Sequence, residues 1–169
     1  LAIKIEICNR YGEATSYGHL GALFESLGQY DKAREYQEKA LAIRIKTANR
    51  DGEATSYGNL GTLFELLGQH DKAQEYQEKA LAIKKKIGDR IGEATSYRNL
   101  MCLFLSQGMY AKANFYLEKA MKVGKGIGHR SGEAANYSCL GEISLKRGEY
   151  DKAQEYYEKE IGRASCRER

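Results

Sequence analysis

The 169-residue sequence has no proline, no tryptophan and no long uninterrupted apolar run. Without proline there are no polyproline segments, collagen repeats or proline-marked linkers. A membrane-spanning helix needs roughly 18 consecutive apolar residues, and no stretch approaches that length. These absences argue against collagen-like proteins and exclude membrane-spanning helices. Because 42% of the residues are hydrophobic, the chain can bury a core, and wholesale disorder is not expected.

Strong charge and clustered cysteines are also missing. The 27 basic and 23 acidic residues give a net charge of +4. Charges of both signs are interleaved, so there is little attraction for nucleic acid or anionic lipid. The cysteines lack CxxC or CxxH spacing and are too sparse for a disulfide-stapled module; they are Cys8, Cys102, Cys139 and Cys166. We therefore expect reduced thiols in a cytoplasmic protein without a metal site.

A 40-residue period organises what is present. GEATSYGHLG at 12–21 returns as GEATSYGNLG at 52–61, GEATSYRNLM at 92–101 and GEAANYSCLG at 132–141. Residues 11–50 and 51–90 are identical at 29 of 40 positions. Self-similarity at a fixed period of this length is typical of a repeat array.

Each unit is predicted to form two helices. Apolar residues at three- and four-residue steps, such as Tyr17, Leu20 and Phe24, form one stripe of helical period. Gly28 is expected to end the first helix, and Asp31 to cap the second. The third unit has alanine at the capping position, which predicts a loss of about 1 kcal/mol there. One helix pair cannot bury both stripes, so the units are expected to stack.

The period also sets the expected boundaries. Residues 1–10 align with the end of a second helix, and full units follow at 11–50, 51–90 and 91–130, with a shortened one at 131–160. The string IGRASCRER at 161–169 departs from the period and resembles a translated sequencing adapter. We interpret 161–169 as a non-native tail; a divergent terminal cap is the alternative.

The pattern Tyr17-x2-Leu20-Gly21-x2-Phe24, followed by Ala33 and Ala40, resembles the tetratricopeptide repeat. The 40-residue units also resemble those of the G-protein-signalling-modulator, or Partner-of-Inscuteable, family. Tyrosine replaces the usual tryptophan, and the closing proline is missing. The resemblance implies an all-α fold: a right-handed α-solenoid of stacked antiparallel helix pairs, with first helices lining the concave face.

On this resemblance, the variable positions of the first helices line a peptide-binding groove. Asn59 and Asn99 are expected to grip a peptide backbone, because a carboxamide offers both donors and an acceptor. Arg98 offers a fork for a ligand carboxylate. Solvated groove residues remain the alternative for all three. The other predicted lining residues are His19, Glu25, Thr62, Glu65, Cys102, Ser138 and Glu142.

The leading functional interpretation is a signalling scaffold or adaptor that binds a peptide segment of another protein. The alternative is a regulatory or assembly segment of a larger multidomain, and even enzymatic, protein. No nucleophile–base–orienter set is evident, so we expect neither catalysis nor a cofactor. The groove positions are not basic enough to favour RNA. Apolar stripes at both ends of the array allow self-association.

Overall fold

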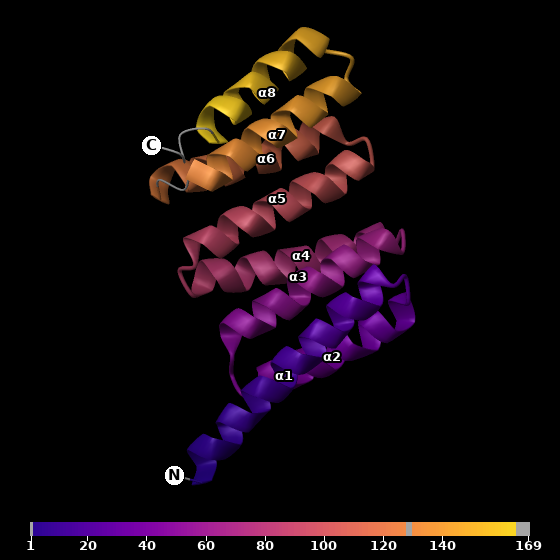
Figure 1. Cartoon of the computed structure of the whole chain (residues 1–169), viewed down its shortest axis with the longest axis vertical. Coiled ribbons are helices and arrows are strands. Elements are labelled where there is room, and N and C mark those ends of the chain that lie inside the picture. The colour runs from indigo at the N-terminus through magenta and orange to yellow at the C-terminus, as the bar shows by residue number, and fades with distance from the viewer. Residues whose placement is uncertain (1, 128–129, 165–169) are drawn as a thin grey trace. The chain divides into compact units, whose positions relative to one another are not determined.

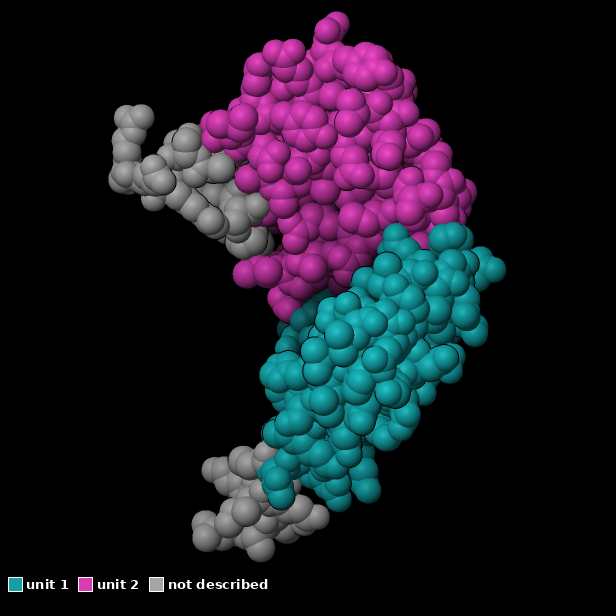
Figure 2. Space-filling model, turned by 45° about the vertical axis from the view of Figure 1, so that its right-hand side comes forward, with its two compact units in different colours: residues 1–88 teal, residues 89–169 magenta. Residues whose placement is uncertain are grey.

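The computed structural model describes residues 2–127 and 130–164. The chain divides into two compact units, unit 1 at residues 1–88 and unit 2 at residues 89–169 (Figure 2). Unit 1 holds α1 (Ala2–Ser26), α2 (Tyr30–Lys46), α3 (Arg50–Leu66) and α4 (His70–Lys86). Unit 2 holds α5 (Arg90–Ser106), α6 (Tyr110–Ile127), α7 (Arg130–Lys146) and α8 (Tyr150–Ala164). No strand occurs in the described residues, so the all-α prediction is confirmed.

Within each unit, consecutive helices form antiparallel pairs (Figure 1). In unit 1, α1 packs on α2 and α3 on α4, and α2 also contacts α3. In unit 2 the pairs are α5 with α6 and α7 with α8, and α6 contacts α7 less extensively than α2 contacts α3. The odd-numbered helices are the first helices of the repeats, and the even-numbered helices are the second.

The predicted glycine stops are confirmed. Gly28 has φ of +70°, in the left-handed region that residues with a Cβ rarely adopt. Its backbone N–H donates to Glu25 O at 2.9 Å, and the next N–H donates to Phe24 O at 2.8 Å. These two bonds satisfy carbonyls at the end of α1. The same conformation recurs at Gly68, Gly108 and Gly148.

The predicted cap at Asp31 is wrong. The N-cap of α2 is Gln29, whose side chain makes no capping hydrogen bond, and Asp31 lies in the first turn. There it pairs with Arg34 at 3.2 Å and faces the positive end of the helix dipole. Alanine at position 111 therefore removes a favourable charge rather than a cap.

The side-chain caps occur instead on first helices. Asn49 Oδ1 accepts a hydrogen bond from Gly52 N at 2.9 Å, at the start of α3. Asp89 Oδ1 accepts one from Gly92 N at 2.8 Å, at the start of α5. Sequence reasoning missed both, because it looked for caps only after the glycine turns.

Residues 1–10 were expected to end a separate helix, but α1 continues unbroken from Ala2 to Ser26. In the next repeat the corresponding turn depends on Ala48, which has φ of +53°. Left-handed backbone is unfavourable for a residue with a Cβ unless tertiary packing holds it. The turn between α2 and α3 is held because those two helices pack together. Of the expected tail at 161–169, residues 161–164 belong to α8 and 165–169 lie outside the described residues.

Aromatic side chains join the two helices of each pair. Tyr36 of α2 contacts Tyr17 and Phe24 of α1, with ring centroids 5.9 and 5.3 Å apart. The equivalent rings meet between α3 and α4 and between α5 and α6, and Tyr137 meets Tyr156 between α7 and α8. The tyrosine stripe therefore packs between helices, as the sequence predicted. Lys32 covers the ring of Phe24 at 5.1 Å and shields its outer face.

A buried glutamine fixes how closely the helices of unit 1 approach. Gln77 of α4 is 2% exposed, and its Nε2 donates to Gly58 O of α3 at 3.0 Å. The side chain lies directly against Gly61: a Cβ at that residue would be only 2.7 Å from Gln77 Nε2. Gln37 and Gly21 make the same contact between α2 and α1. The glycine is therefore needed for space.

Unit 2 fills the same position differently. Met101 replaces the glycine on α5, and Leu117 replaces the glutamine on α6; both are fully buried. Between α7 and α8 the pair is Gly141 with Tyr157, where a Cβ on the glycine would be 2.6 Å from the ring. Where the first helix has glycine, the second helix has the long glutamine or tyrosine side chain, and where the first helix has methionine, the second has leucine. The two positions therefore behave as one packing unit.

The first prediction compares two glycines on α3. Gly61→Ala should lower the free energy of unfolding by about 1–3 kcal/mol, because it overpacks the contact with Gln77. Gly58→Ala should instead raise it by up to about 1 kcal/mol, because a Cβ there meets nothing within 4 Å and alanine favours the helix. Urea unfolding followed by circular dichroism measures both. Stabilisation by both substitutions would contradict the packing argument.

The second prediction concerns the caps. Asn49→Ala should lower the free energy of unfolding by about 1 kcal/mol, because Gly52 N loses its acceptor. Gln69→Ala should have almost no effect, because the Gln69 side chain makes no capping bond at the start of α4. Thermal unfolding of the two variants gives the comparison, and equal losses would refute this assignment of caps.

Candidate functional site

An open pocket of about 450 Å³ lies on the first helices of unit 2. It is lined by the end of α5, the glycine turn that follows, the first residue of α6 and the C-terminal half of α7. The lining residues are Cys102, Leu105, Ser106, Gly108, Tyr110, Glu142 and Lys146. Two of the predicted groove residues, Cys102 and Glu142, therefore lie in one pocket.

The pocket combines an apolar wall with a charged one. Leu105 and Tyr110 are half-buried, so each presents part of an apolar surface to the pocket. Glu142 and Lys146 are exposed and lie one helical turn apart on α7. Such a mixture suits a ligand with both an apolar side chain and polar or charged groups.

The two thiols near this pocket lie in different environments. Cys102 is exposed, and Cys139 is half-buried on α7. Burial, reinforced by Cys102, raises the pKa of the Cys139 thiol to about 11. At neutral pH Cys139 is therefore protonated, and a protonated thiol is a poor nucleophile.

Leu105 marks a chemical difference between the units. The equivalent positions in unit 1 are Glu25 and Glu65, and both are half-buried. Burial raises the pKa of Glu25 above its usual value. The predicted residues His19 and Thr62 are exposed on α1 and α3, and the Thr62 hydroxyl donates to Gly58 O at 3.2 Å. The first helices of unit 1 thus present acidic and polar groups where unit 2 presents leucine.

Asn59 has a structural contact that the sequence did not reveal. Its Nδ2 donates to Gln37 Oε1 at 3.3 Å, and Gln37 Nε2 in turn donates to Gly18 O at 3.2 Å. Asn59 is half-buried and Gln37 is 1% exposed. A carboxamide has two amide hydrogens and one acceptor, so this bond uses only one hydrogen of Asn59. Asn99, the equivalent residue in unit 2, is also half-buried.

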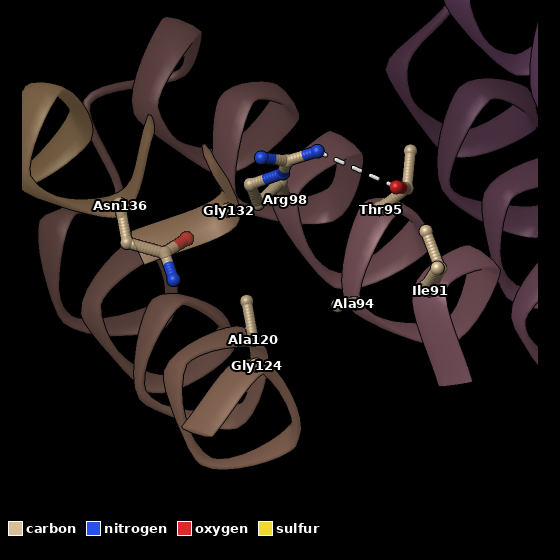
Figure 3. A pocket seen from close by; sticks show the side chains of 8 residues that line it. All are labelled: Ile91, Ala94, Thr95, Arg98, Ala120, Gly124, Gly132 and Asn136. Carbon is tan, nitrogen blue, oxygen red and sulfur yellow. Dashed lines mark hydrogen bonds between the residues drawn. The ribbon is translucent and has the colours of Figure 1, made fainter. Parts of the chain in front are cut away.

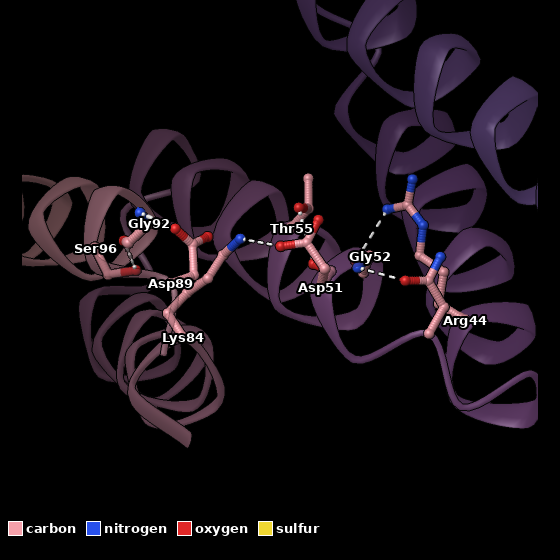
Figure 4. A network of polar contacts seen from close by, with 9 residues as sticks. Arg44, Asp51, Gly52, Thr55, Lys84, Asp89, Gly92 and Ser96 are labelled. Carbon is pink, nitrogen blue, oxygen red and sulfur yellow. Dashed lines mark hydrogen bonds and ion pairs between the residues drawn. The ribbon is translucent and has the colours of Figure 1, made fainter. Parts of the chain in front are cut away.

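An arginine from a second helix joins α2 to α3 in unit 1. Arg44 Nη1 donates to Ser56 Oγ at 2.7 Å. It also donates to Gly52 O at 3.2 Å (Figure 4). Its guanidinium lies beside Gly18, where a Cβ would be 3.4 Å from Nη2. Burial lowers the pKa of Arg44, and the Asp51 carboxylate opposes that shift. Asp51 also forms an ion pair with Lys84 at 2.6 Å.

Arg98 occupies the reverse arrangement in unit 2. The position equivalent to Gly18 is Arg98, and the position equivalent to Arg44 is Gly124. Arg98 is half-buried, donates to Thr95 Oγ1 at 3.4 Å and lines a space that Gly124 also lines. In unit 2 the guanidinium therefore comes from the first helix, α5, and the second helix, α6, has a glycine at the position of Arg44. Ser138, the equivalent residue on α7, is half-buried.

Sequence reasoning placed no site residue outside the first helices. Tyr110 begins α6 and reaches the pocket because the Gly108 turn brings the start of α6 next to the end of α5. Leu105, Ser106 and Lys146 occupy groove positions but were not selected. For Leu105 and Lys146 a signal was present in the alignment of the repeats with one another, because these positions differ chemically from their counterparts in unit 1.

The described residues contain neither a membrane-spanning helix nor a metal-binding cluster. Among residues 2–127 and 130–164, no helix combines the length and apolar character that crossing a membrane requires. Within the same ranges, no three histidine, cysteine or acidic side chains converge to hold a metal ion.

Comparison with solved structures places the fold. The Bacillus subtilis aspartyl phosphate phosphatase F matches with a TM-score of 0.84 and 20% identity, covering 93% of this chain and 41% of that chain. A Rap protein complexed with competence and sporulation factor matches at 0.81 and 21%, covering 92% and 43%. BtubC from P. vanneervenii matches at 0.77 and 22%, covering 90% and 63%. This chain therefore spans less than two thirds of each of these chains, and at such identities the likeness shows the fold alone.

Family comparison gives the same architecture at the level of sequence. The comparison with curated proteins found no significant match. Two tetratricopeptide-repeat models match, one over residues 12–86 and the other over residues 138–165, and together they cover more than half of the chain. With its helix pairs, glycine turns and aromatic contacts, the chain therefore contains tetratricopeptide repeats.

Proposed function

We propose that this chain is a protein-interaction scaffold whose unit 2 binds an extended peptide segment of a partner protein. The observation that carries the proposal is the pocket of about 450 Å³ on α5 and α7. Its volume lies in the range of sites that enclose small ligands or a few side chains. Its residues come from two first helices and the start of a second one, so a peptide bound there contacts two repeats at once.

The distribution of sequence change between repeats supports a binding role. Some positions that pack helices together are constant, as at Ala33, Ala73, Ala113 and Ala153. Some positions that line the pocket differ from their counterparts in unit 1, as Leu105 differs from Glu25 and Glu65. A constant framework with a variable lining gives each repeat its own chemical surface, and specificity then depends on those side chains.

The chemistry of the pocket defines the expected ligand. Leu105 and the ring of Tyr110 suit an apolar side chain of the peptide, and the Tyr110 hydroxyl offers a hydrogen bond. Glu142 and Lys146 offer opposite charges one turn apart on α7, so they suit a polar backbone or a side chain of either sign. The ligand is therefore a segment with one large apolar residue flanked by polar ones.

The predicted asparagine contacts have a more limited place in this proposal. Asn59 in unit 1 and Asn99 in unit 2 each remain candidates for hydrogen bonds to a peptide backbone. Because Asn59 also donates to buried Gln37, its truncation leaves Gln37 Oε1 without that donor and costs stability as well as binding. Arg98 lies beside the space left by Gly124, so a ligand carboxylate is its secondary role in this proposal.

The relatives are consistent with ligand binding on this fold. One of the similar structures is a Rap protein complexed with competence and sporulation factor. This complex supports the idea that a fold of this kind can hold another molecule. The chemistry expected of a partner of this chain follows from the residues of its own pocket. The signalling role and the cytoplasmic location belong to the same proposal.

The third prediction tests the pocket with peptides selected from a random display library against the wild-type chain. Leu105→Glu, which introduces the residue found at positions 25 and 65, should weaken their binding at least about tenfold. The reason is that a carboxylate replaces the apolar wall and resists desolvation. Fluorescence polarisation with labelled peptides measures the dissociation constants.

Phe115→Glu is the matched control for that experiment. Phe115 is 52% exposed on α6 and does not line the pocket, so the same change to glutamate should leave affinity unchanged. Circular dichroism of both variants confirms that helicity is retained. Equal affinities for wild type and Leu105→Glu, or equal losses in both variants, would refute a peptide site at this pocket.

A further inference from the structure

A second, much smaller space lies between α5, α6 and α7 of unit 2 (Figure 3). The centre of a water molecule can occupy about 10 Å³ of this space. Thr95 and Arg98 border it from α5, Gly124 from α6, and Gly132 and Asn136 from α7. All of these residues belong to one compact unit.

The repeat period explains why this space exists. Two periods earlier, the positions of Gly124, Gly132 and Asn136 hold Arg44, Gly52 and Ser56. There the Arg44 guanidinium donates to both Gly52 O and Ser56 Oγ. In unit 2 a glycine replaces the arginine, so the acceptors remain and their donor is missing. The space is therefore the position that a guanidinium occupies in unit 1.

Asn136 supplies the independent sign of a ligand. It is 3% exposed, and among the described residues its Oδ1 is buried with no hydrogen-bond partner. Figure 3 shows this oxygen turned toward the side of the space where Arg98 lies, with the amide nitrogen turned toward Gly124. A buried acceptor without a donor is costly, so native proteins satisfy such groups with protein or ordered water.

We propose that this space binds one ordered water molecule. The water donates hydrogen bonds to Asn136 Oδ1 and to Gly132 O, in place of the guanidinium that serves Gly52 and Ser56 in unit 1. Its oxygen accepts a hydrogen bond from the guanidinium of Arg98. Three such bonds are the usual number for a buried water.

Size and chemistry favour water over other occupants. About 10 Å³ of accessible volume corresponds to a single water-sized probe and leaves no room for sulfate, phosphate or a carboxylate side chain. A small anion would suit Arg98 but would face the Asn136 carboxamide oxygen, which is an acceptor. Water alone both donates to that oxygen and accepts from arginine.

A water here also fits the less extensive contact between α6 and α7. A water held by three bonds bridges groups that a long side chain would otherwise join directly. Arg98 acts here as a positioning residue, because its guanidinium approaches from α5 and holds the water against α7. The α6–α7 junction is thus a hydrated version of the α2–α3 junction.

The fourth prediction is tested first by a high-resolution crystal structure of the full wild-type chain. The expected result is density for one water within about 2.7–3.2 Å of both Asn136 Oδ1 and a nitrogen of Arg98. A direct bond from Arg98 to Asn136 Oδ1 would overturn the proposal. So would clear density for both side chains with nothing between them.

A solution experiment with paired variants gives the second test. In the wild-type chain, the side-chain amide of Asn136 should show nuclear Overhauser cross-peaks to a long-lived water. Arg98→Gly combined with Gly124→Arg recreates the Gly18 and Arg44 arrangement, so the arginine should displace the water and abolish those cross-peaks. Gly126→Arg adds the same side chain at an exposed glycine of α6 and should leave them unchanged. Cross-peaks that are absent from the wild type, or that survive the double substitution, would refute the site.

Discussion

In unit 1, the contact between a first-helix glycine and a buried glutamine of the second helix sets the geometry of each helix pair. The glutamine carboxamide also bonds to a carbonyl across the pair. In the same two helix pairs, aromatic rings of the facing helices meet with centroids 5.3 and 5.2 Å apart. The glycine and the glutamine together therefore set how closely the two helices approach.

The same contact links helix packing to the surface that faces a ligand. Gln37 receives a hydrogen bond from Asn59 on the next first helix, so a residue predicted only to bind peptide also joins two repeats. Arg44 performs a similar task between α2 and α3. Groove residues and junction residues therefore overlap. When such a residue is substituted between repeats, the hydrogen bonds of buried groups have to be preserved as well as the chemistry offered to a partner.

The exchange of Arg44 for Arg98 illustrates that constraint. In both units a guanidinium lies near the same junction, although it comes from the second helix in one and from the first helix in the other. Arg44 fills the α2–α3 junction, whereas Arg98 leaves a space in the α6–α7 junction, because it extends from α5 and Gly124 has no side chain. Divergence between repeats has thus kept the cation and changed its position.

The sequence was sufficient for the period, the helix pairs and the glycine turns, because each follows from spacing within one repeat. It was not sufficient for features that depend on contacts between helices. Asp31 is a residue type that often caps helices, but it lies inside the first turn of α2. Asn49 caps α3, although the turn before it contains no glycine that would have marked it in the sequence. Likewise, the alignment revealed that position 105 changes to leucine, but only the fold shows Leu105 and Tyr110 in one pocket.

The most direct test of the account is to map where a bound peptide lies. Backbone amide shifts of the isotope-labelled chain, recorded with and without a selected peptide, locate the contact. We predict changes concentrated at the residues of the unit 2 pocket, such as Cys102, Leu105 and Glu142. Changes concentrated instead on the outer faces of α6 and α8 would contradict the claim that the first helices of unit 2 form the binding surface.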